Sequence, residues 1–338
     1  IIMTKKWKKA IALSLAALTL TGALAGCGDD KKAASGAAKP AAGQTIKINF
    51  PTAGASGALY AVGAAITNMW SSQVPGVQAS SQASAGGIAN LNMVSEGEAQ
   101  VSIAISSNVY QCLNGTDSFK DHAYKDLKAI GGLYLNPNQV VATANSGINS
   151  LKDVKGKHFA VASAGSSVYN ECETHFTAAG LSFPDDIKAE YITFTDAADM
   201  LQNGSIDGAW IMSGAPASAV TQALTGGAHL VEIDDNLIKE LKAKYPWYTS
   251  YTIKAGTYPN QDKDVKTSAI KMVMFCRGDL PEDVVYQLTK TLWEHMDELG
   301  QSQKNLKGLT AENAVKDIAD IPLHPGAAKY YKEIGVLK

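Results

Sequence analysis

The chain has 338 residues, of which 46% are hydrophobic, 18% charged and 7% aromatic, a composition that excludes a disordered chain and a collagen-like or coiled-coil rod. Lysine plus arginine number 30 against 32 for aspartate plus glutamate, so the net charge is −2, which excludes the concentrated basic face that nucleic acid requires. Arg277 is the only arginine, so a carboxylate or phosphate ligand has to be held without a second guanidinium.

The first 26 residues have the pattern of a bacterial export signal. Lysines between residues 5 and 9 precede an apolar run over residues 10–24, which is shorter than the about 20 residues of a membrane-spanning helix. The run ends in LAGC at residues 24–27, which is similar to a lipobox. We therefore expect lipidation of Cys27 and an extracytoplasmic protein anchored to the bilayer, in the periplasm or on the outer face of the cell membrane. An ordinary secretory signal is the alternative.

Residues 27–44 are small and polar and include a proline, which is typical of a flexible tether. From Thr45 onward, strand patterns alternate with helix patterns, and this alternation predicts an α/β fold with parallel sheets covered on both faces. The expected strands cover residues 46–50, 77–83, 101–105, 158–162, 190–194, 208–212, 229–233 and 269–276. The expected helices cover residues 58–73, 88–96, 168–179 and 281–299.

Four turns that lead from a strand into a helix are rich in glycine, serine and other small residues: 52–57, 84–87, 106–108 and 163–167. The free N–H groups and the dipole at a helix N-terminus favour an anion there. In open α/β sheets, ligands bind beyond the carboxyl ends of the strands. The turns therefore predict a cleft that holds a small carboxylate without arginine. The alternative is that they are only N-caps and tight turns.

Other reactive side chains give no further site. Glu171 and His175 are four residues apart on an expected helix, and we interpret them as a solvated pair rather than metal ligands. Cys112, Cys172 and Cys276 fit no zinc spacing, and buried free thiols are favoured over a disulfide. The sequence has no nucleophile with a partner base and no metal-ligand set. We therefore expect no enzyme, no cofactor and no metal.

Several segments together resemble the TAXI-type solute-binding proteins of TRAP (tripartite ATP-independent periplasmic) transporters. They are TAGASGALYAVG at 52–63, GGIANL at 86–91, AGTYPNQD at 255–262, DLPEDV at 279–284 and PLHPGA at 322–327. The resemblance implies a type II periplasmic-binding-protein fold, with a ligand cleft between two lobes. We expect lobe I to comprise residues 45–135 and 255–338 and lobe II residues 136–254, with hinges at 135–138 and 251–254.

The resemblance also implies a function. The protein would capture a small organic anion, such as glutamate or a related carboxylate, and deliver it to the membrane subunits of a TRAP permease. Asn108 stands where the family often has aspartate, so a negative charge that could pair with a ligand ammonium is absent. A ligand-sensing lipoprotein for a membrane receptor and an enzyme on the same bilobal scaffold stay open as alternatives.

We predict a cleft made of hydroxyl, amide and backbone donors, with Tyr60 or Trp210 over the apolar part of the solute and Arg277 away from the site. The predicted ligand-binding residues are Gly54, Ser56, Tyr60, Ser84, Asn90, Ser107, Asn108, Ser163, Ser166, Ser167, Asn170 and Trp210.

Overall fold

The computed structural model describes residues 45–245 and 247–338. The predicted signal segment 1–26, the tether 27–44 and the lipidation site Cys27 lie outside the described residues. None of the helices in the described part combines the length and the apolar character that crossing a membrane requires.

The chain begins with a parallel strand pair. Strand β1 (Ile46–Pro51) pairs in parallel with β2 (Val77–Gln82), and helix α1 (Ala58–Gln73) connects them. Ile48 and Phe50 alternate with more exposed residues along β1 and are buried in the core. This βαβ unit has the order and the bounds that the hydrophobic pattern predicts, because strand and helix periods are both clear here.

A larger sheet contains the other eight strands. Its spatial order is β3 (Val101–Ile105), β10 (Val265–Arg277), β4 (Leu127–Ala142), β7 (Gly208–Met212), β5 (His158–Ala160) and β6 (Lys188–Glu190). Strand β8 (His229–Val231) pairs with β4, and β9 (Tyr248–Ile253) pairs with β10. The sheet is mixed: β10 is antiparallel to β3, β4 and β9, whereas β5 is parallel to β6 and β7. The expectation of parallel sheets is therefore wrong for the strands around β10.

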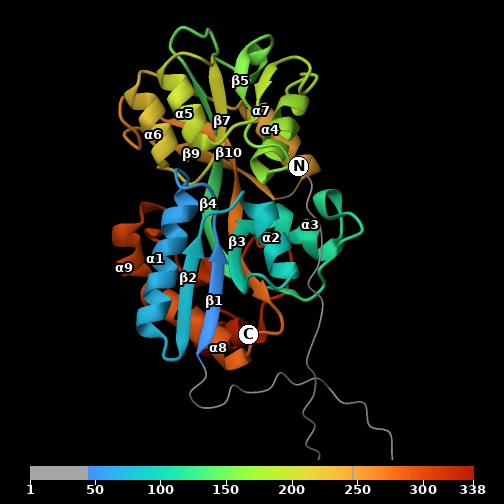
Figure 1. Ribbon diagram of the computed structural model, residues 1–338, viewed down its shortest axis with the longest axis vertical. Helices are drawn as coiled ribbons and strands as arrows, with labels where there is room; N and C mark the ends of the chain where they lie inside the picture. The colour runs from blue at the N-terminus through green and yellow to red at the C-terminus, as the bar shows by residue number, and fades with distance from the viewer. Residues whose placement is uncertain (1–44, 246) are drawn as a thin grey trace, which may run out of the picture. The chain divides into compact units, whose positions relative to one another are not determined.

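Helices flank these strands in two groups (Figure 1). Helix α1 belongs with β1–β3, as do α2 (Gly87–Ser95), α3 (Ser106–Asn114), α8 (Glu282–Glu294), α9 (Met296–Ser302), α10 (Ala311–Ala314) and α11 (Pro325–Glu333). Helices α4 (Ser167–Ala178), α5 (Phe194–Gln202), α6 (Ser218–Thr225) and α7 (Asp235–Lys244) belong with β5–β8. Short 3₁₀ helices cover Asp117–Phe119, Leu151–Val154 and Lys304–Leu306. We call the first group lobe I and the second lobe II.

Each lobe has its own apolar cores. In lobe I, Phe50 and Trp70 pack in one cluster with Leu288 and Tyr331. A second cluster of lobe I lies under α2 and α3. In lobe II, one cluster is built on α5 and α6 and the other on α4, where Phe176 packs in the interior. The first cluster also includes Met212, Leu241 and Tyr248 of lobe II, so it continues across the meeting of the lobes, whereas each of the other three clusters lies within one lobe.

Two long strands connect the lobes (Figure 1). Residues 127–137 of β4 pair with β10, and residues 138–142 of the same strand pair with β7. Strand β10 pairs with β9 over residues 265–270 and with β3 over 272–276. Both strands therefore run continuously from one lobe into the other.

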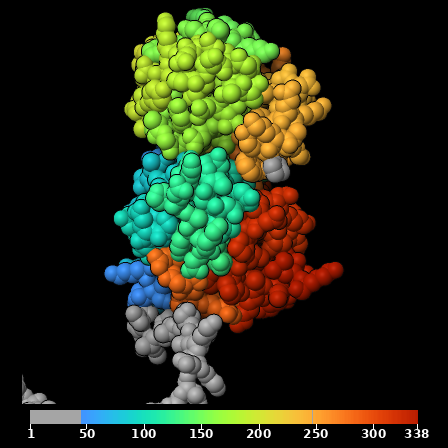
Figure 2. All heavy atoms as spheres, turned by 90° about the vertical axis from the view of Figure 1, so that its right-hand side faces the viewer, coloured from blue at the N-terminus to red at the C-terminus, as the bar shows by residue number. Residues whose placement is uncertain are grey.

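The second crossing differs from the predicted one. Tyr258 and Val265 pack into the core built on α5 and α6. In Figure 2, the yellow-green residues of lobe II lie above the blue and cyan residues of lobe I. The chain thus returns to lobe I along β10, and not at residues 251–254. The reason is that 255–264 forms the connection between the paired strands β9 and β10, a pairing that the sequence pattern did not reveal.

Two other predicted elements also differ. The expected strand at 190–194 is wrong: β6 ends at Glu190, and Thr193 caps α5 by accepting a hydrogen bond at Oγ1 from the Asp196 N–H. The expected helix 281–299 ends at Glu294, and a second helix begins at Met296. Strand β4 was not predicted at all, because Gly131-Gly132 and Asn136-Pro137-Asn138 interrupt its apolar pattern.

Candidate ligand-binding site

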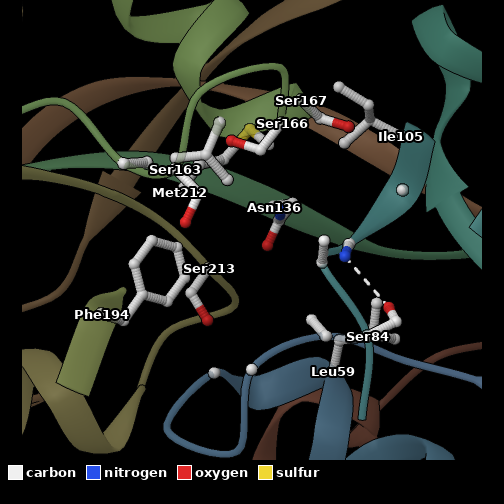
Figure 3. A pocket seen from close by; sticks show the side chains of 18 of the residues that line it. Leu59, Ser84, Ile105, Asn136, Ser163, Ser166, Ser167, Phe194, Met212 and Ser213 are labelled. Atoms are coloured by element: carbon white, nitrogen blue, oxygen red, sulfur yellow. Dashed lines mark hydrogen bonds between the residues drawn. The ribbon is translucent and has the colours of Figure 1, made fainter. Parts of the chain in front are cut away.

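A cavity of about 380 Å³ lies where the two lobes meet, next to the crossing strands. Small-molecule sites have volumes of this order. Figure 3 shows Ser166 and Ser167 on one side of the cavity, Leu59 and Ser84 on the opposite side, and Asn136 between them. The wall consists of Ala53, Gly54, Gly57, Leu59, Ser84, Ala85, Gly86, Gly87, Ala104, Ile105, Asn136, Ala162, Ser163, Ser166, Ser167, Val168, Ile192, Thr193, Phe194, Met212, Ser213 and Met272.

Five helices begin at this wall. The N-cap residues of α1, α2, α3, α4 and α5 are Gly57, Gly86, Ile105, Ser166 and Thr193, and all of them line the cavity. The first N–H groups of a helix have no acceptor within the helix, and the helix dipole places partial positive charge there. The wall therefore presents positive potential without a charged side chain.

The helix starts of the two lobes differ in how they are capped. In lobe II, Ser166 Oγ accepts from the Tyr169 N–H at 3.1 Å, and Thr193 caps α5 in the same way. In lobe I, α1, α2 and α3 have no side-chain cap, because glycine and isoleucine carry no acceptor. The first N–H groups of α2 and α3 thus have no side-chain cap that would compete with a ligand acceptor, whereas the first N–H of α1 has a partner in lobe II.

One contact joins the lobes across the cavity. The Ala58 N–H at the start of α1 donates to Ser213 Oγ at 2.9 Å. Ser213 directly follows β7 of lobe II. A Cβ placed on Gly57 would lie 3.7 Å from Ser213 Oγ and 3.8 Å from the Phe194 ring. At this end of the cavity, lobe I therefore meets the start of α5.

The lobes also meet at the other end of the cavity. A Cβ placed on Gly87 would lie 3.0 Å from Ser167 Oγ and 3.1 Å from Ala104 Cβ. Ser167 is 4% exposed, and its Oγ has no hydrogen-bond partner among the described residues. A buried hydroxyl without a partner is costly, so Ser167 is a group that a bound molecule would satisfy.

The described wall contains no aspartate, glutamate, lysine, arginine or histidine. Its polar side chains are serine, threonine and asparagine, and the large apolar ones are Leu59, Ile105, Ile192, Phe194, Met212 and Met272. Such a wall can donate hydrogen bonds and cover apolar surface. It offers neither a general base nor a metal-ligand set, and no group of three potential metal ligands occurs among the described residues.

Five of the predicted ligand-binding residues line the cavity, namely Gly54, Ser84, Ser163, Ser166 and Ser167. Asn90 lies behind the wall, where its Nδ2 donates to Thr52 O at 2.7 Å and its Oδ1 accepts from Ser84 Oγ at 2.6 Å. Asn90 therefore positions Ser84 and does not itself reach the cavity.

The other predicted residues lie outside the wall. Ser107 and Asn108 are buried in the first turn of α3, where Ser107 Oγ and Asn108 Oδ1 have no partner in the described part of the chain. Ser56 Oγ accepts from Thr195 Oγ1, and Asn170 Nδ2 donates to Ser118 Oγ. Tyr60 is 37% exposed on α1.

Trp210, which was predicted to cover the apolar part of the solute, is not one of the residues that line the cavity. It is 1% exposed and packs in the core of lobe II against His175 and Phe176, with ring centroids 4.9 and 5.6 Å away. The physical reason is that β7 is buried on both faces. The face that carries Trp210 packs on the core of lobe II built on α4.

Several wall residues were missed by the sequence analysis: Leu59, Asn136, Thr193, Phe194, Met212, Ser213 and Met272. Two of them carried a usable signal. Ser213-Gly214 follows a predicted strand just as the four selected turns do, and Asn136 is a polar residue within an apolar stretch. The other side chains are ordinary core types, which only the fold brings to the cavity.

Glu171 and His175 are buried, at 6% and 0% exposure, and are not the solvated pair that was expected. Tyr248 Oη donates to Glu171 Oε2 at 2.7 Å, and His175 Nε2 lies 2.7 Å from Ser268 Oγ. Burial raises the pKa of Glu171 to about 7 and lowers the pKa of His175 to about 4. Burial thus favours the neutral form of both groups.

The remaining candidates are accounted for by the fold. Cys112, Cys172 and Cys276 are buried free thiols. Arg277 donates from Nε and Nη2 to the Asp279 carboxylate at 2.9 and 2.5 Å and is not a wall residue.

Comparison with known proteins identifies the family. Residues 50–335 match the NMT1-like family, and the chain belongs to it. Among solved structures, the alkanesulfonate-binding protein SsuA from Xanthomonas axonopodis pv. citri, bound to MOPS, is 16% identical with a TM-score of 0.50, covering 86% of this chain and 85% of that one. The periplasmic binding protein BugD is 16% identical with a TM-score of 0.53, covering 86% and 98%. The fold is therefore the two-lobed α/β fold of type II periplasmic binding proteins, as predicted.

Proposed function

We propose that this protein is an extracytoplasmic solute-binding protein of a TAXI-type TRAP transporter, which captures a small organic anion and delivers it to the membrane permease. The observation that carries the proposal is the convergence of five helix N-termini on one uncharged cavity. N–H groups and helix dipoles from both lobes can together hold an anion, and no lysine or arginine is needed for this.

The position of the cavity supports capture by closure. Its wall takes residues from both lobes, and β4 and β10, the strands that run through both, lie beside it. A ligand that contacts both lobes favours the closed arrangement over the open one by the contacts that it makes only there. A permease can then distinguish the loaded protein from the empty one by its shape.

The wall supports binding rather than catalysis. Its serine hydroxyls have no histidine or carboxylate bonded to them in the described part of the chain, and Ser166 Oγ already accepts from the Tyr169 N–H. A serine without a base is a weak nucleophile. The proposal therefore includes that the protein is not an enzyme.

The assignment to a TRAP transporter rests on the sequence. The segments at 86–91, 255–262, 279–284 and 322–327 resemble TAXI-type proteins in order and spacing. The segment 86–91 contains the start of α2 at the cavity. We further propose that Cys27 is lipidated and holds the protein at the membrane next to its permease.

A capture experiment tests the proposal. The protein is stripped of bound molecules by unfolding and refolding, incubated with a small-molecule extract, and re-isolated, and the released compounds are identified by mass spectrometry. We expect the wild type to enrich an unmodified organic anion. Gly87→Leu should enrich none, because a side chain at Gly87 would collide with Ser167 and Ala104 and hold the lobes apart.

Ser95→Leu is the matched control, since Ser95 lies at the opposite end of α2 from the cavity. It should capture the same compound as the wild type. Failure of the wild type to enrich any solute would contradict the proposal, and so would release of a chemically altered compound.

A further inference from the structure

We infer that the solute is a carboxylate that carries no ammonium group and has an apolar body, so that amino acids are excluded. The inference rests on the proposed function and narrows its solute class. It comes from how the polar and apolar residues are distributed between the two ends of the cavity.

One end of the cavity is built to receive an anion. The uncapped starts of α2 and α3 lie here, since Gly87 at the start of α2 is close to both Ala104 and Ser167. Ser167 starts α4 and adds an unpartnered buried hydroxyl. Three helices of nine or more residues thus point their N-termini at one place, next to a donor with no other partner.

The opposite end carries large apolar side chains. Phe194 and Met212 lie at one side of the cavity in Figure 3, with Ser213 and Ser163 beside them, and Leu59 lies at the lower edge next to Ser84. Two donors at this end are already used, because the Ala58 N–H donates to Ser213 Oγ at 2.9 Å and Thr193 Oγ1 donates to Asp196 Oδ2 at 2.6 Å. A hydrocarbon or aromatic group is the part of a solute that this end would accommodate.

An ammonium group finds no partner charge in the cavity. The described wall holds no carboxylate, and an ammonium that loses its water without gaining an opposite charge is strongly disfavoured. One acid, Asp196, contacts a wall residue: its Oδ2 accepts from Thr193 Oγ1 at 2.6 Å. Asp196 is exposed and follows Phe194 by two residues in α5, so solvent screens its charge.

Matched ligand pairs test the inference by isothermal titration calorimetry on the refolded protein. The probes are butanoate, 4-methylpentanoate and 3-phenylpropanoate, each compared with its 2-amino counterpart, namely 2-aminobutanoate, leucine and phenylalanine. We expect at least one simple acid to bind, and to bind at least about tenfold more tightly than its amino acid. The neutral amide of that acid should also bind at least about tenfold more weakly, because it brings no negative charge to the helix N-termini beside Ser167.

The variant Ser167→Ala should weaken binding of the acid by about tenfold and change binding of the amide by less. Ser95→Ala, far from the cavity on α2, should change neither. An amino acid that binds as tightly as its simple acid, an amide that matches the acid, or absence of binding by all probes would overturn the inference. Capture of an amino acid from the extract would overturn it as well while leaving the proposed function intact.

Discussion

Helix α4 carries two sets of polar residues that differ in charge and in whether they have hydrogen-bond partners. At its N-terminus, Ser166 and Ser167 line the cavity. One and two turns later, Glu171 and His175 face the strands that connect the lobes, and they have hydrogen-bond partners there on β9 and β10. The cavity group is uncharged and partly unpartnered, whereas the group at the crossing strands contains ionisable residues that are buried and bonded.

The difference shows how to separate binding residues from structural ones in an α/β lobe. Ser268 of β10 accepts from Asn138 Nδ2 of β4 at 3.0 Å, so the second group also ties the two crossing strands to each other. A buried polar residue with partners on other elements stabilises the fold. A buried donor without a partner, next to empty volume, is available to a ligand. Three predictions test this distinction.

The largest effect is expected at Trp210, which the sequence assigned to the ligand and the structure assigns to the core. Removing a fully buried indole leaves a large void, so Trp210→Ala should lower the free energy of unfolding by about 3–5 kcal/mol. Urea unfolding monitored by circular dichroism measures this. Solute affinity of the fraction that stays folded should change little, since Trp210 is not a wall residue. A large loss of affinity at unchanged stability would show that the placement in the core is wrong.

The next largest effect is expected from the buried acid on α4. Because the pKa of Glu171 is about 7 in the fold against 4.5 for the free side chain, the fold retains a proton that the unfolded chain releases. This makes the free energy of unfolding fall as the pH rises from 4.5 to 7. The pKa of His175 is about 4 against 6.5, so its contribution rises with pH from 4 to 6.5. The two contributions oppose each other over most of this range.

Glu171→Gln should remove the first contribution and leave the second. The free energy of unfolding of the variant should rise as the pH rises from 4 to 6.5. Above pH 7 it should exceed that of the wild type by about 3 kcal/mol. The amide oxygen can still accept from Tyr248, so the packing is retained. Urea unfolding at pH 5 and pH 8 gives both values. Parallel pH profiles for wild type and variant would contradict the assignment of a neutral Glu171.

The sequence predicted cavity residues correctly where a local pattern alone determines the position of a side chain. The turns at 84–87 and 163–167 were selected because small residues follow a strand and precede a helix, and this is the arrangement that brings Ser84 and Ser166 to the wall. The same rule applied to residues 212–214 would have found Ser213.

The rest required tertiary information. Phe194 and Met272 are indistinguishable in sequence from core residues, and only the meeting of the lobes places them at the cavity. The prediction for Trp210 was made without knowing which face of its strand it occupies. A strand that is buried on both faces gives no sequence signal for that. The pairing of β9 with β10, which moved the second crossing, depends on contacts between distant residues of the folded chain.

The smallest effect separates the two adjacent serines at the start of α4, to which the sequence gave the same role. Ser166 Oγ is committed to the Tyr169 N–H at 3.1 Å, whereas Ser167 Oγ has no partner in the described residues. Ser166→Ala should therefore lower the free energy of unfolding by about 1 kcal/mol, as loss of an N-cap does, and weaken solute binding by less than Ser167→Ala does. Ser167→Ala should leave stability nearly unchanged. Urea unfolding and calorimetric titration of both variants with the captured solute measure the two effects. Stronger loss of affinity in Ser166→Ala than in Ser167→Ala would mean that the capping serine, and not the unpartnered one, holds the anion.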